Sequence, residues 1–505
     1  MKLLSACIIV FLSVSTSAYA LQYSNSQGLQ NSNPLCFQFD TSSGSAGSSC
    51  WNGQSKTNIS CYDLAPSGQE WINIASSGGW FVLNFKVSSY NSITKSCNKD
   101  YLGYLSVSFS DNNQKPKVTT QDGNTQIYTV NSTAKLYGLY FFTYTVPQFP
   151  TPTVYNTLQY RGVNLSGAEF EKPYNLTPSA FDAYYFVTKG MNTVRIPFRW
   201  EYLQPNLGLA IDFTKGYGKQ LMDLVGTLSN AGIYVIVDMH NYMRYPLGSG
   251  NDGPVIGVDS KATAVLYAKA WQEIAAEIMR RNYNNNYVLL DLMNEPWSSR
   301  GESLSSSPSK LSTEIILDNY IAAMTAIRSV GFKGMLLLEG NAFSGLLDWE
   351  ANYYGTPNAT VFMPKNIPDS NYAINVHQYL GQNAAPTTTD CVTPSTLLTL
   401  KNFSQFVTWM STNKVPVILT ETGGIPSSNC TQDINIFLSA LESNAYQPGQ
   451  GGFIGWLGWT GGDAWYPVSD SNFQKQFLIA PKINGSEAIQ MQQGAFGGHL
   501  SAPSQ

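Results

Sequence analysis

The stretch YVLLDLMNEPW, residues 287–297, carries the pattern that decides the fold. Its apolar run, Tyr287–Leu292, is short and ends in polar residues, which is typical of a buried strand. Amphipathic segments of helical length lie on both sides of it, over residues 261–281 and 312–330. A strand between two helices is the repeating unit of an α/β fold with a parallel sheet.

The same unit repeats along the chain. Further apolar runs that end in polar residues cover 158–164, 193–197, 233–238, 334–338, 373–376, 415–419 and 452–456. Amphipathic segments lie between most of them, and several are followed by a glycine, which is typical of a helix C-terminus. These eight strands predict a (β/α)8 TIM barrel over residues 154–487. A doubly wound open sheet is the alternative, but no G-x-G-x-x-G follows the first strand.

The region before the barrel follows another pattern. Residues 104–110 alternate between apolar and small polar side chains, and aromatic or β-branched runs recur between clusters of Gly, Asn and Ser. This pattern predicts a small all-β sandwich over residues 33–147, joined to the barrel by a proline-rich linker over 148–153. Its tryptophans, at 51, 71 and 80, could stack on a polysaccharide or fill the core of the sandwich. Residues 488–505 are rich in Gly, Gln and Ser, and we expect a flexible tail.

The N-terminus resembles a targeting segment. Lys2 precedes an apolar stretch and then Ala18-Tyr19-Ala20, which predicts a signal peptide over residues 1–20 and a secreted protein. Cys7 lies within that peptide, and an even number of cysteines remains: Cys36, Cys50, Cys61, Cys97, Cys391 and Cys430. Three disulfides are therefore expected, with Cys391–Cys430 as the simplest late pair. The early four cysteines allow several pairings that the sequence does not distinguish.

Composition limits the partners. The formal net charge is -4, so no basic excess is present to hold a nucleic-acid backbone. No later apolar stretch is long enough for a membrane span, and we expect a monomer without membrane contact once the signal peptide is removed. Candidate glycosylation sequons begin at Asn58, Asn131, Asn164, Asn175, Asn358, Asn402, Asn429 and Asn484. Asn164 ends the first predicted strand, so we expect it to be unglycosylated.

Functional groups gather where the predicted barrel strands end, which is where this fold carries its chemistry. His240 and His377, two of the three histidines in the chain, follow the third and sixth strands. Glu295 and Glu421 end the fourth and seventh strands, and a carboxylate after a buried strand is costly unless it is hydrogen-bonded or used. Two carboxylates at one barrel mouth indicate glycoside hydrolysis, which needs a proton donor and a second carboxylate. Glu339, at the end of strand five, is interpreted as a supporting or subsite residue.

The tryptophans near the predicted strand ends are typical of a site that binds sugars. Residues with flat faces lie near strand ends, at Trp200, Trp297, Trp456, Trp459 and Trp465. A metal site is a weaker interpretation, because neither H-x-x-x-H nor H-E-x-x-H is present, and we expect no metal and no cofactor. A serine hydrolase is poorly supported, since the chain has no G-x-S-x-G.

These motifs resemble a known family. Asn294-Glu295-Pro296 after an apolar strand, with Glu421 in Thr-Glu-Thr-Gly-Gly, is similar to glycoside hydrolase family 5, the retaining cellulases. The segment Asp238-Met-His-Asn-Tyr242 and the pair Gly455-Trp456 extend the likeness, which is strongest to fungal-type endo-β-1,4-glucanases and covers about residues 155–487. The motifs occur in order on different strands, which makes the resemblance more specific than Asn-Glu-Pro alone.

The resemblance implies roles for the carboxylates and their neighbours. Glu295 would be the general acid/base and Glu421 the nucleophile. Arg195 would keep Glu421 ionised, and Tyr379 would hydrogen-bond it.

It also implies roles in holding the sugar. Asn294 would bind the 2-hydroxyl of the sugar at the cleaved bond, while His240 and His377 would bind hydroxyls and tune the two carboxylates. Trp456 would lie under the reacting ring.

We therefore expect a secreted, retaining endo-β-1,4-glucanase acting on cellulose or a related β-glucan. Endo-β-mannanases, β-1,3-glucanases and xyloglucanases share the architecture, and the fold does not decide among them. A non-catalytic wall-binding glycoprotein is the alternative from another class. The retention of both Glu295 and Glu421 argues against it.

Overall fold

The computed structural model describes the strands between residues 20 and 142 by their backbone. It describes side chains in residues 158–169, 190–247, 253–297, 311–381, 402–425, 427–461 and 495–500, and in parts of 178–188 and 390–391. Several predictions fall outside the described residues: the signal peptide before Ala20, the linker over 148–153, the side chains of the early cysteines and tryptophans, Trp465, and the sequons at Asn58, Asn131, Asn175 and Asn484.

The chain forms two compact units. The first comprises residues 1–146 with 482–485, and the second comprises residues 147–481 with 486–505. In the first unit one antiparallel sheet has the order β3-β2-β1-β8-β7 and the other has the order β4-β5-β6-β9. The strands are β1 Ala20–Ser24, β2 Leu35–Phe39, β3 Gly47–Trp51, β4 Ile59–Ile74, β5 Gly78–Asn91, β6 Ser96–Asp111, β7 Lys117–Gln121, β8 Thr125–Thr129 and β9 Lys135–Phe142. An all-β region was expected here, and its packing as a sandwich stays a prediction.

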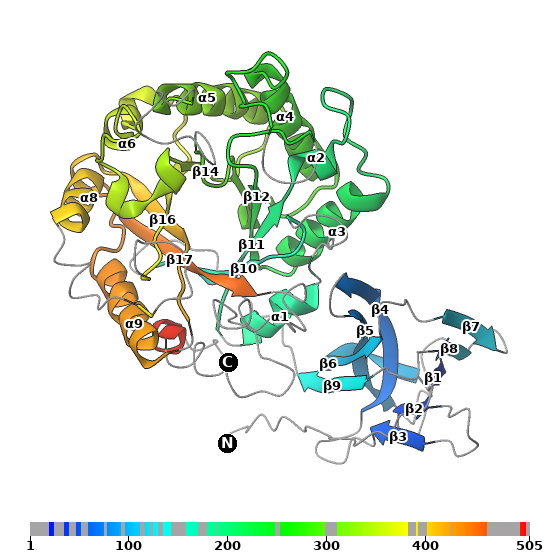
Figure 1. Ribbon diagram of the computed structural model, residues 1–505. Helices are drawn as coiled ribbons and strands as arrows, with labels where there is room; N and C mark the ends of the chain where they lie inside the picture. Colours follow the sequence, from blue (N-terminus) through cyan, green and yellow to red (C-terminus); the bar gives the residue numbers. More distant parts are fainter. Residues whose placement is uncertain are drawn as a thin grey trace. The chain divides into compact units, whose positions relative to one another are not determined.

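The second unit is a closed barrel of parallel strands, in which each strand pairs with the next and β17 pairs with β10 (Figure 1). The strands are β10 Tyr160–Leu165, β11 Thr193–Phe198, β12 Tyr234–Met239, β13 Val288–Asp291, β14 Leu336–Glu339, β15 Tyr372–His377, β16 Pro416–Glu421 and β17 Gly452–Gly461. All eight predicted strands are present, and the TIM barrel is confirmed.

Helices surround the strands. They are α1 Ala180–Thr188, α2 Trp200–Leu203, α3 Gly216–Asn230, α4 Ala264–Arg280, α5 Thr313–Ser329, α6 Asn358–Val361, α8 Lys401–Thr412 and α9 Ser428–Ser443. The hydroxyl groups of Ser312 and Ser427 cap α5 and α9 by accepting backbone N–H groups. Gly331 follows α5 at a φ of 88°, a conformation that favours glycine, as the sequence pattern predicted. Among the described residues, no helix combines the length and the apolar character needed to span a membrane.

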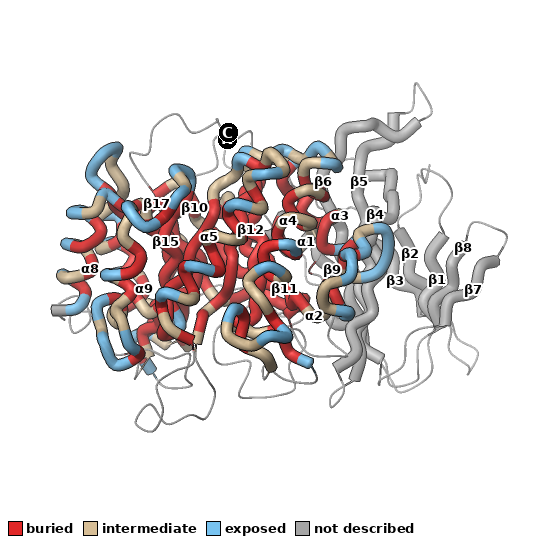
Figure 2. The backbone as a smooth tube through the Cα atoms, turned by 90° about the horizontal axis from the view of Figure 1, so that it is seen from above, coloured by how far each residue is buried: buried red, intermediate tan, exposed pale blue. Residues whose placement is uncertain are grey.

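Apolar side chains from seven strands fill the middle of the barrel. The cluster includes Tyr160, Ile236, Leu289, Leu337, Ala373, Ile418 and Leu457. Buried strands occupy the centre, and exposed positions lie mainly on helices and loops (Figure 2). Because successive residues of a strand point to opposite faces, residues two positions beyond this cluster reach the carboxyl end of the barrel.

The C-terminal segment corrects one expectation. Residues 495–500 include the short helix Gly497–His499, which lies beside α9 in Figure 1. Phe496 is fully buried, and its ring lies 5.3 Å from that of Trp456. This part of the predicted flexible tail is therefore packed on the barrel, because an aromatic side chain in a Gly-rich sequence finds an apolar surface to cover.

Candidate active site

Five of the eight barrel strands contribute the predicted polar side chains to one site. The predicted residues come from β11 (Arg195), β15 (His377) and β16 (Glu421), and from just beyond β12 (His240), β13 (Asn294, Glu295) and β15 (Tyr379). Each of these strands is buried along most of its length. Strand pairing therefore fixes where each functional group lies.

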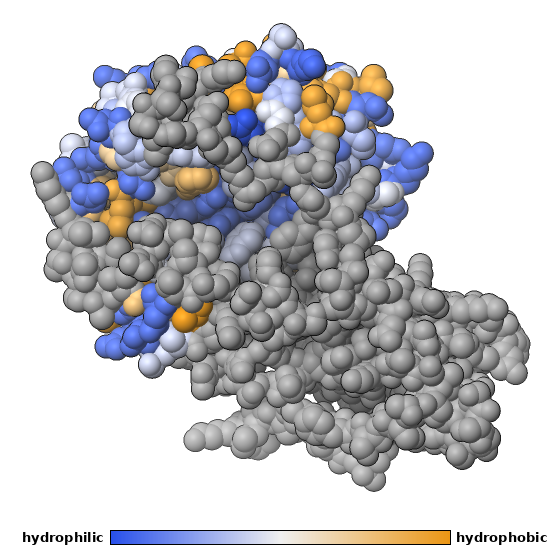
Figure 3. All heavy atoms as spheres, viewed as in Figure 1, coloured by the Kyte–Doolittle hydropathy of each residue, from blue (hydrophilic) through white to orange (hydrophobic). Residues whose placement is uncertain are grey.

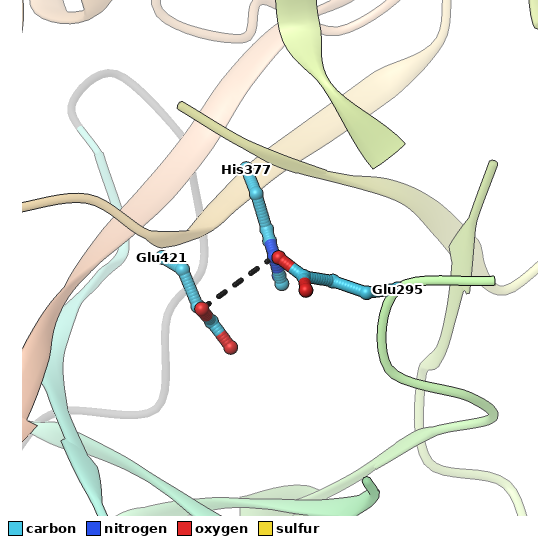
Figure 4. Close-up of side chains that lie close together, drawn as sticks. All are labelled: Glu295, His377 and Glu421. Atoms are coloured by element: carbon cyan, nitrogen blue, oxygen red, sulfur yellow. Dashed lines mark hydrogen bonds and ion pairs between the residues drawn. The ribbon is translucent and has the colours of Figure 1, made fainter. Parts of the chain in front are cut away.

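The two glutamates face each other across the site (Figure 4). One carboxylate oxygen of Glu295 and one of Glu421 lie within 4.8 Å of each other, with a ring nitrogen of His377 in the same group. Their side chains are 17% and 5% exposed, so a ligand could reach both. Carboxyl groups about 5–5.5 Å apart are typical of retaining glycosidases, whereas inverting enzymes leave about 6.5–9.5 Å.

The carboxylate of Glu421 accepts hydrogen bonds at both of its oxygens. Arg195 donates from Nη1 to Oε1 at 2.7 Å, and the hydroxyl of Tyr379 donates to Oε2 at 2.7 Å. Burial raises the pKa of Tyr379 well above its usual value, so this hydroxyl keeps its proton and remains a donor. A carboxylate held by a cation and a hydroxyl is suited to act as a nucleophile.

Arg195 is the central cation of the site. Its fully buried guanidinium also pairs with Asp291 at 2.9 Å and with Asp238 and Glu339 at 3.1 Å. Burial alone would lower the pKa of Arg195, but these carboxyl groups outweigh it and raise that pKa well above its usual value. Burial also raises the pKa values of Asp291 and Glu339, while the neighbouring Arg195 and His377 oppose that shift.

Glu295 has different neighbours. Its Oε1 lies 2.8 Å from Nδ1 of His377, and its backbone N–H donates to Oε2 of Glu339 at 2.7 Å. The backbone of Glu295 has a φ of 44°, which is uncommon for a residue other than glycine and occurs at functional sites. Burial lowers the pKa of His377, but Glu339, Glu421 and Glu295 outweigh it, and the net shift is well above its usual value. Glu295 and His377 thus form a hydrogen-bonded pair.

The pKa of His240 shifts in the opposite direction to that of His377. Nδ2 of Asn294 can only donate, and it lies 3.2 Å from Nε2 of His240, since Oδ1 of Asn294 accepts from Arg195. The ring proton is therefore on Nδ1, which faces Asp238 at 2.8 Å. Burial lowers the pKa of His240 to about 3, which agrees with a neutral ring. The unprotonated Nε2 of His240 therefore contacts Asn294.

A metal ion does not fit this set of residues. Glu295, His377 and Glu421 offer three ligand atoms close together. Glu421 already binds the guanidinium of Arg195, and the raised pKa of His377 favours a cationic ring. Positive charge at both positions opposes the binding of a metal cation.

The tryptophans correct the expectation for Trp456. Its side chain is fully buried under Phe496, so it offers no open face to a sugar, and Trp200 is fully buried as well. The structure places Trp459 at the site instead, partly exposed and stacked on His240 at 5.7 Å. Strand β17 continues to Gly461 rather than ending at residue 456, which moves the mouth to Trp459.

A second aromatic pair lies beside Glu295. Trp297 stacks on Phe343 at 4.6 Å, and Phe343 donates its backbone N–H to the carbonyl of Pro296. Phe343 is 42% exposed. The coloured part of the barrel face in Figure 3 is mainly hydrophilic, with separate hydrophobic patches. The exposed Phe343 and the half-buried Trp297 therefore form an aromatic pair, in which Trp297 is close to Glu295 in the chain.

Several buried residues of the site were not singled out from the sequence. These are Asp238, Asp291, Asn375 and Thr420, which link the charged groups to one another. Asp238 and Asn375 lie two residues before His240 and His377, on the same face of their strands. That spacing is the sequence feature that could have found them. Glu339 is fully buried and supports the site, as interpreted from the sequence.

The remaining sequence predictions concern covalent features. Cys391 and Cys430 form a disulfide, which confirms the expected pair. Asn164 is fully buried and donates from Nδ2 to the carbonyl of Thr420 at 2.7 Å, in agreement with an unmodified asparagine. Asn358 is likewise buried, and its amide donates to the carbonyl of Asn341.

Comparison with known proteins identifies the family. Residues 152–463 match the model of the cellulases, glycosyl hydrolase family 5. The chain belongs to glycosyl hydrolase family 5. It is therefore a glycoside hydrolase, and the resemblance drawn from its motifs is confirmed.

Family 5 relatives of the chain include fungal endoglucanases. Endoglucanase 1 of Robillarda sp. is 28% identical over 62% of this chain and 80% of the relative. Endo-beta-1,4-glucanase B of Emericella nidulans is 26% identical over 60% of this chain and 83% of the relative. Among solved structures, an endo-beta-1,4-glucanase of Xanthomonas axonopodis pv. citri is 28% identical, with a TM-score of 0.57 over 68% of this chain and all of that one.

Proposed function

We propose that this family 5 enzyme is an endo-β-1,4-glucanase that cleaves β-glucan with retention of configuration. The approach of one Glu295 oxygen and one Glu421 oxygen to within 4.8 Å carries the proposal, because it is nearer to the spacing of about 5–5.5 Å in retaining glycosidases than to about 6.5–9.5 Å in inverting ones. The relatives named as endo-β-1,4-glucanases support β-1,4-glucan as the substrate class.

In the first step Glu421 attacks the anomeric carbon of the sugar, and the bond from that carbon to the leaving oxygen breaks. Glu295 gives its proton to the leaving oxygen, so the shortened glucan departs as an alcohol. Arg195 and Tyr379 orient the carboxylate of Glu421 for attack through their hydrogen bonds.

In the second step a water molecule attacks the anomeric carbon of the glycosyl-enzyme. Glu295, now ionised, takes a proton from this water, and the bond to Glu421 breaks with its electrons returning to the carboxylate. His377 contacts Glu295 in both steps and keeps its carboxyl group oriented.

Asn294 and Trp459 are proposed to bind the reacting sugar. Nδ2 of Asn294 has a second N–H beyond the one given to His240, and we assign it to the 2-hydroxyl. Trp459, rather than Trp456 as expected from the sequence, is assigned to lie under the reacting sugar ring. Its own ring is partly exposed beside His240.

Two further proposals concern the whole chain. The N-terminal pattern and the Cys391–Cys430 disulfide support secretion, since disulfides persist in oxidising compartments. The region over residues 33–147 is proposed to contact polysaccharide through its tryptophans. Cellulose pull-down of the full-length Glu421→Gln enzyme, with and without Trp80→Ala, tests that contact without hydrolysis.

The function is tested by reducing-sugar release from carboxymethylcellulose, barley β-glucan, mannan and laminarin. Release from the first two, with β-anomers as the initial products by NMR, is expected. Release mainly from mannan or laminarin would replace β-1,4-glucan as the substrate, and initial α-anomers would overturn the retaining mechanism. No release from any polymer would favour a binding protein.

A further inference from the structure

The hydrogen bonds of His377 can be followed outward from the site, and their donors and acceptors are fixed at each step. Nδ2 of Asn375 donates to Asp291 at 2.8 Å and to Glu339 at 2.9 Å, so its two protons are used. Oδ1 of Asn375 must therefore face the other way, where the hydroxyl of Thr420 donates to it at 2.7 Å.

That hydroxyl has one proton, and Asn375 receives it. Oγ1 of Thr420 lies 3.0 Å from Nε2 of His377, and with its own proton committed it can only accept. Oε1 of Glu339 lies 3.3 Å from the same nitrogen and is a second acceptor. Nε2 of His377 therefore carries a proton in either charge state of the ring, and Nδ1 is the nitrogen that can gain or lose one.

Nδ1 is also the nitrogen that meets Glu295, at 2.8 Å. We infer that Thr420 and Glu339 are positioning residues that fix Nε2–H of His377, so that Nδ1 shares a proton with the acid/base Glu295. The inference rests on the proposed function, because it concerns the proton that Glu295 gives to the leaving oxygen.

Glu339 has a second contact with the same machinery. Its Oε2 accepts the backbone N–H of Glu295, while its Oε1 faces donors from Arg195, Asn375 and His377. A glutamine at this position would place an NH2 group against donors on one side or the other. Glu339→Gln is therefore nearly isosteric but cannot satisfy both sides, which costs more than its change in shape.

The experiment compares two substrates that differ in their need for an acid. Cellotetraose has a sugar leaving group that must be protonated, whereas 2,4-dinitrophenyl β-cellobioside releases a stable anion without a proton. Misplacing the proton on Glu295 should lower kcat/KM on the first substrate and spare kcat/KM on the second. A general loss of structure would lower both equally.

Thr420→Val should reduce kcat/KM on cellotetraose by about tenfold, a part of the 10²–10⁴ that general acid catalysis contributes, with less than about a twofold change on the dinitrophenyl substrate. Thr420→Ser restores the hydroxyl and should recover most of the loss. Glu339→Gln should show the same substrate dependence with a larger reduction.

Thr422→Val is the matched control. Thr422 is fully buried two residues further along, and its hydroxyl has no hydrogen-bond partner among the described residues, so its loss should change neither substrate. Equal losses on both substrates in Thr420→Val, or no recovery in Thr420→Ser, would overturn the inference. A wild-type enzyme inactive on both substrates would overturn the proposed function and this inference with it.

Discussion

The two faces of strand β17 show how one strand serves two regions of the molecule. Trp459 points toward the carboxyl end of the barrel, where it stacks on His240 beside the charged site. Trp456, three residues earlier, lies under Phe496 and is fully buried. Residues an odd number apart on a strand point to opposite faces, so the same type of side chain lies at the site at one position and is buried against Phe496 at the other.

The two faces of β17 should differ in what they contribute, one to activity and the other to stability. Variants at the mouth of the barrel should lose activity while the protein stays folded, because these side chains meet polar neighbours and a ligand. Variants beneath Phe496 should lose stability while the folded fraction stays active, because they remove apolar burial.

Glu421→Gln should have the largest effect on activity. The variant removes the attacking carboxylate, and kcat on barley β-glucan should fall on the order of 10⁴-fold or more, as for other nucleophile deletions. Unfolding should change little, because Asp238, Asp291 and Glu339 still pair with Arg195. Reducing-sugar assays and thermal unfolding measure the two effects. Glu314→Gln, on the exposed first turn of α5, is the control.

Glu295→Ala should have the next largest effect, and it depends on the substrate. Loss of the general acid should lower kcat/KM on β-glucan by about 10²–10⁴. On 2,4-dinitrophenyl β-cellobioside the first step needs no acid, so kcat/KM should be nearly retained while kcat falls. Added azide should raise kcat and yield β-cellobiosyl azide. An α-azide product would show that the assignment of the two glutamates, or the retaining mechanism, is wrong.

The paired tryptophans test the comparison directly. Trp459→Ala should lower kcat/KM on cellotetraose about tenfold or more, since it removes a stacking face, and should leave the unfolding temperature nearly unchanged. Trp456→Ala should destabilise the protein by about 3–5 kcal/mol, with kcat per folded molecule unchanged. Activity titration and urea unfolding measure both. The same response from both variants would mean that the two faces of β17 are not separate.

The strands and strand-end residues of the barrel could be predicted because both depend on local pattern. An apolar run such as 288–291 has to be buried, and the polar residues after it then fall at one end of the barrel. Glu295, Glu421 and the two histidines were found in this way. The resemblance to family 5 added their roles.

What the sequence did not reveal depends on contacts between distant residues. Trp456 was given its role through the resemblance of Gly455-Trp456 to the family, with the strand expected to end at residue 456. Pairing with β10 extends β17 to Gly461. The role of Thr420 rests on partners from β15, which no local pattern reports. Residues 495–500 looked flexible because Gly-rich composition does not show that Phe496 has a surface to cover.

The smallest expected effect concerns the C-terminal segment itself. Phe496→Ala should lower the free energy of unfolding by about 2 kcal/mol, the transfer free energy of one buried phenyl side chain. The loss should be smaller than for Trp456→Ala, because a terminal segment can detach or shift, whereas a strand residue leaves a cavity. Ending the chain after Gly494 should cost at least as much, since it also removes the contact of His499 with Glu442 at 3.0 Å. Urea unfolding measures both variants, and kcat per folded molecule should stay constant. Full stability after this truncation would show that Phe496 does not hold the segment against β17, and the contrast between the two faces would then rest on Trp456 alone.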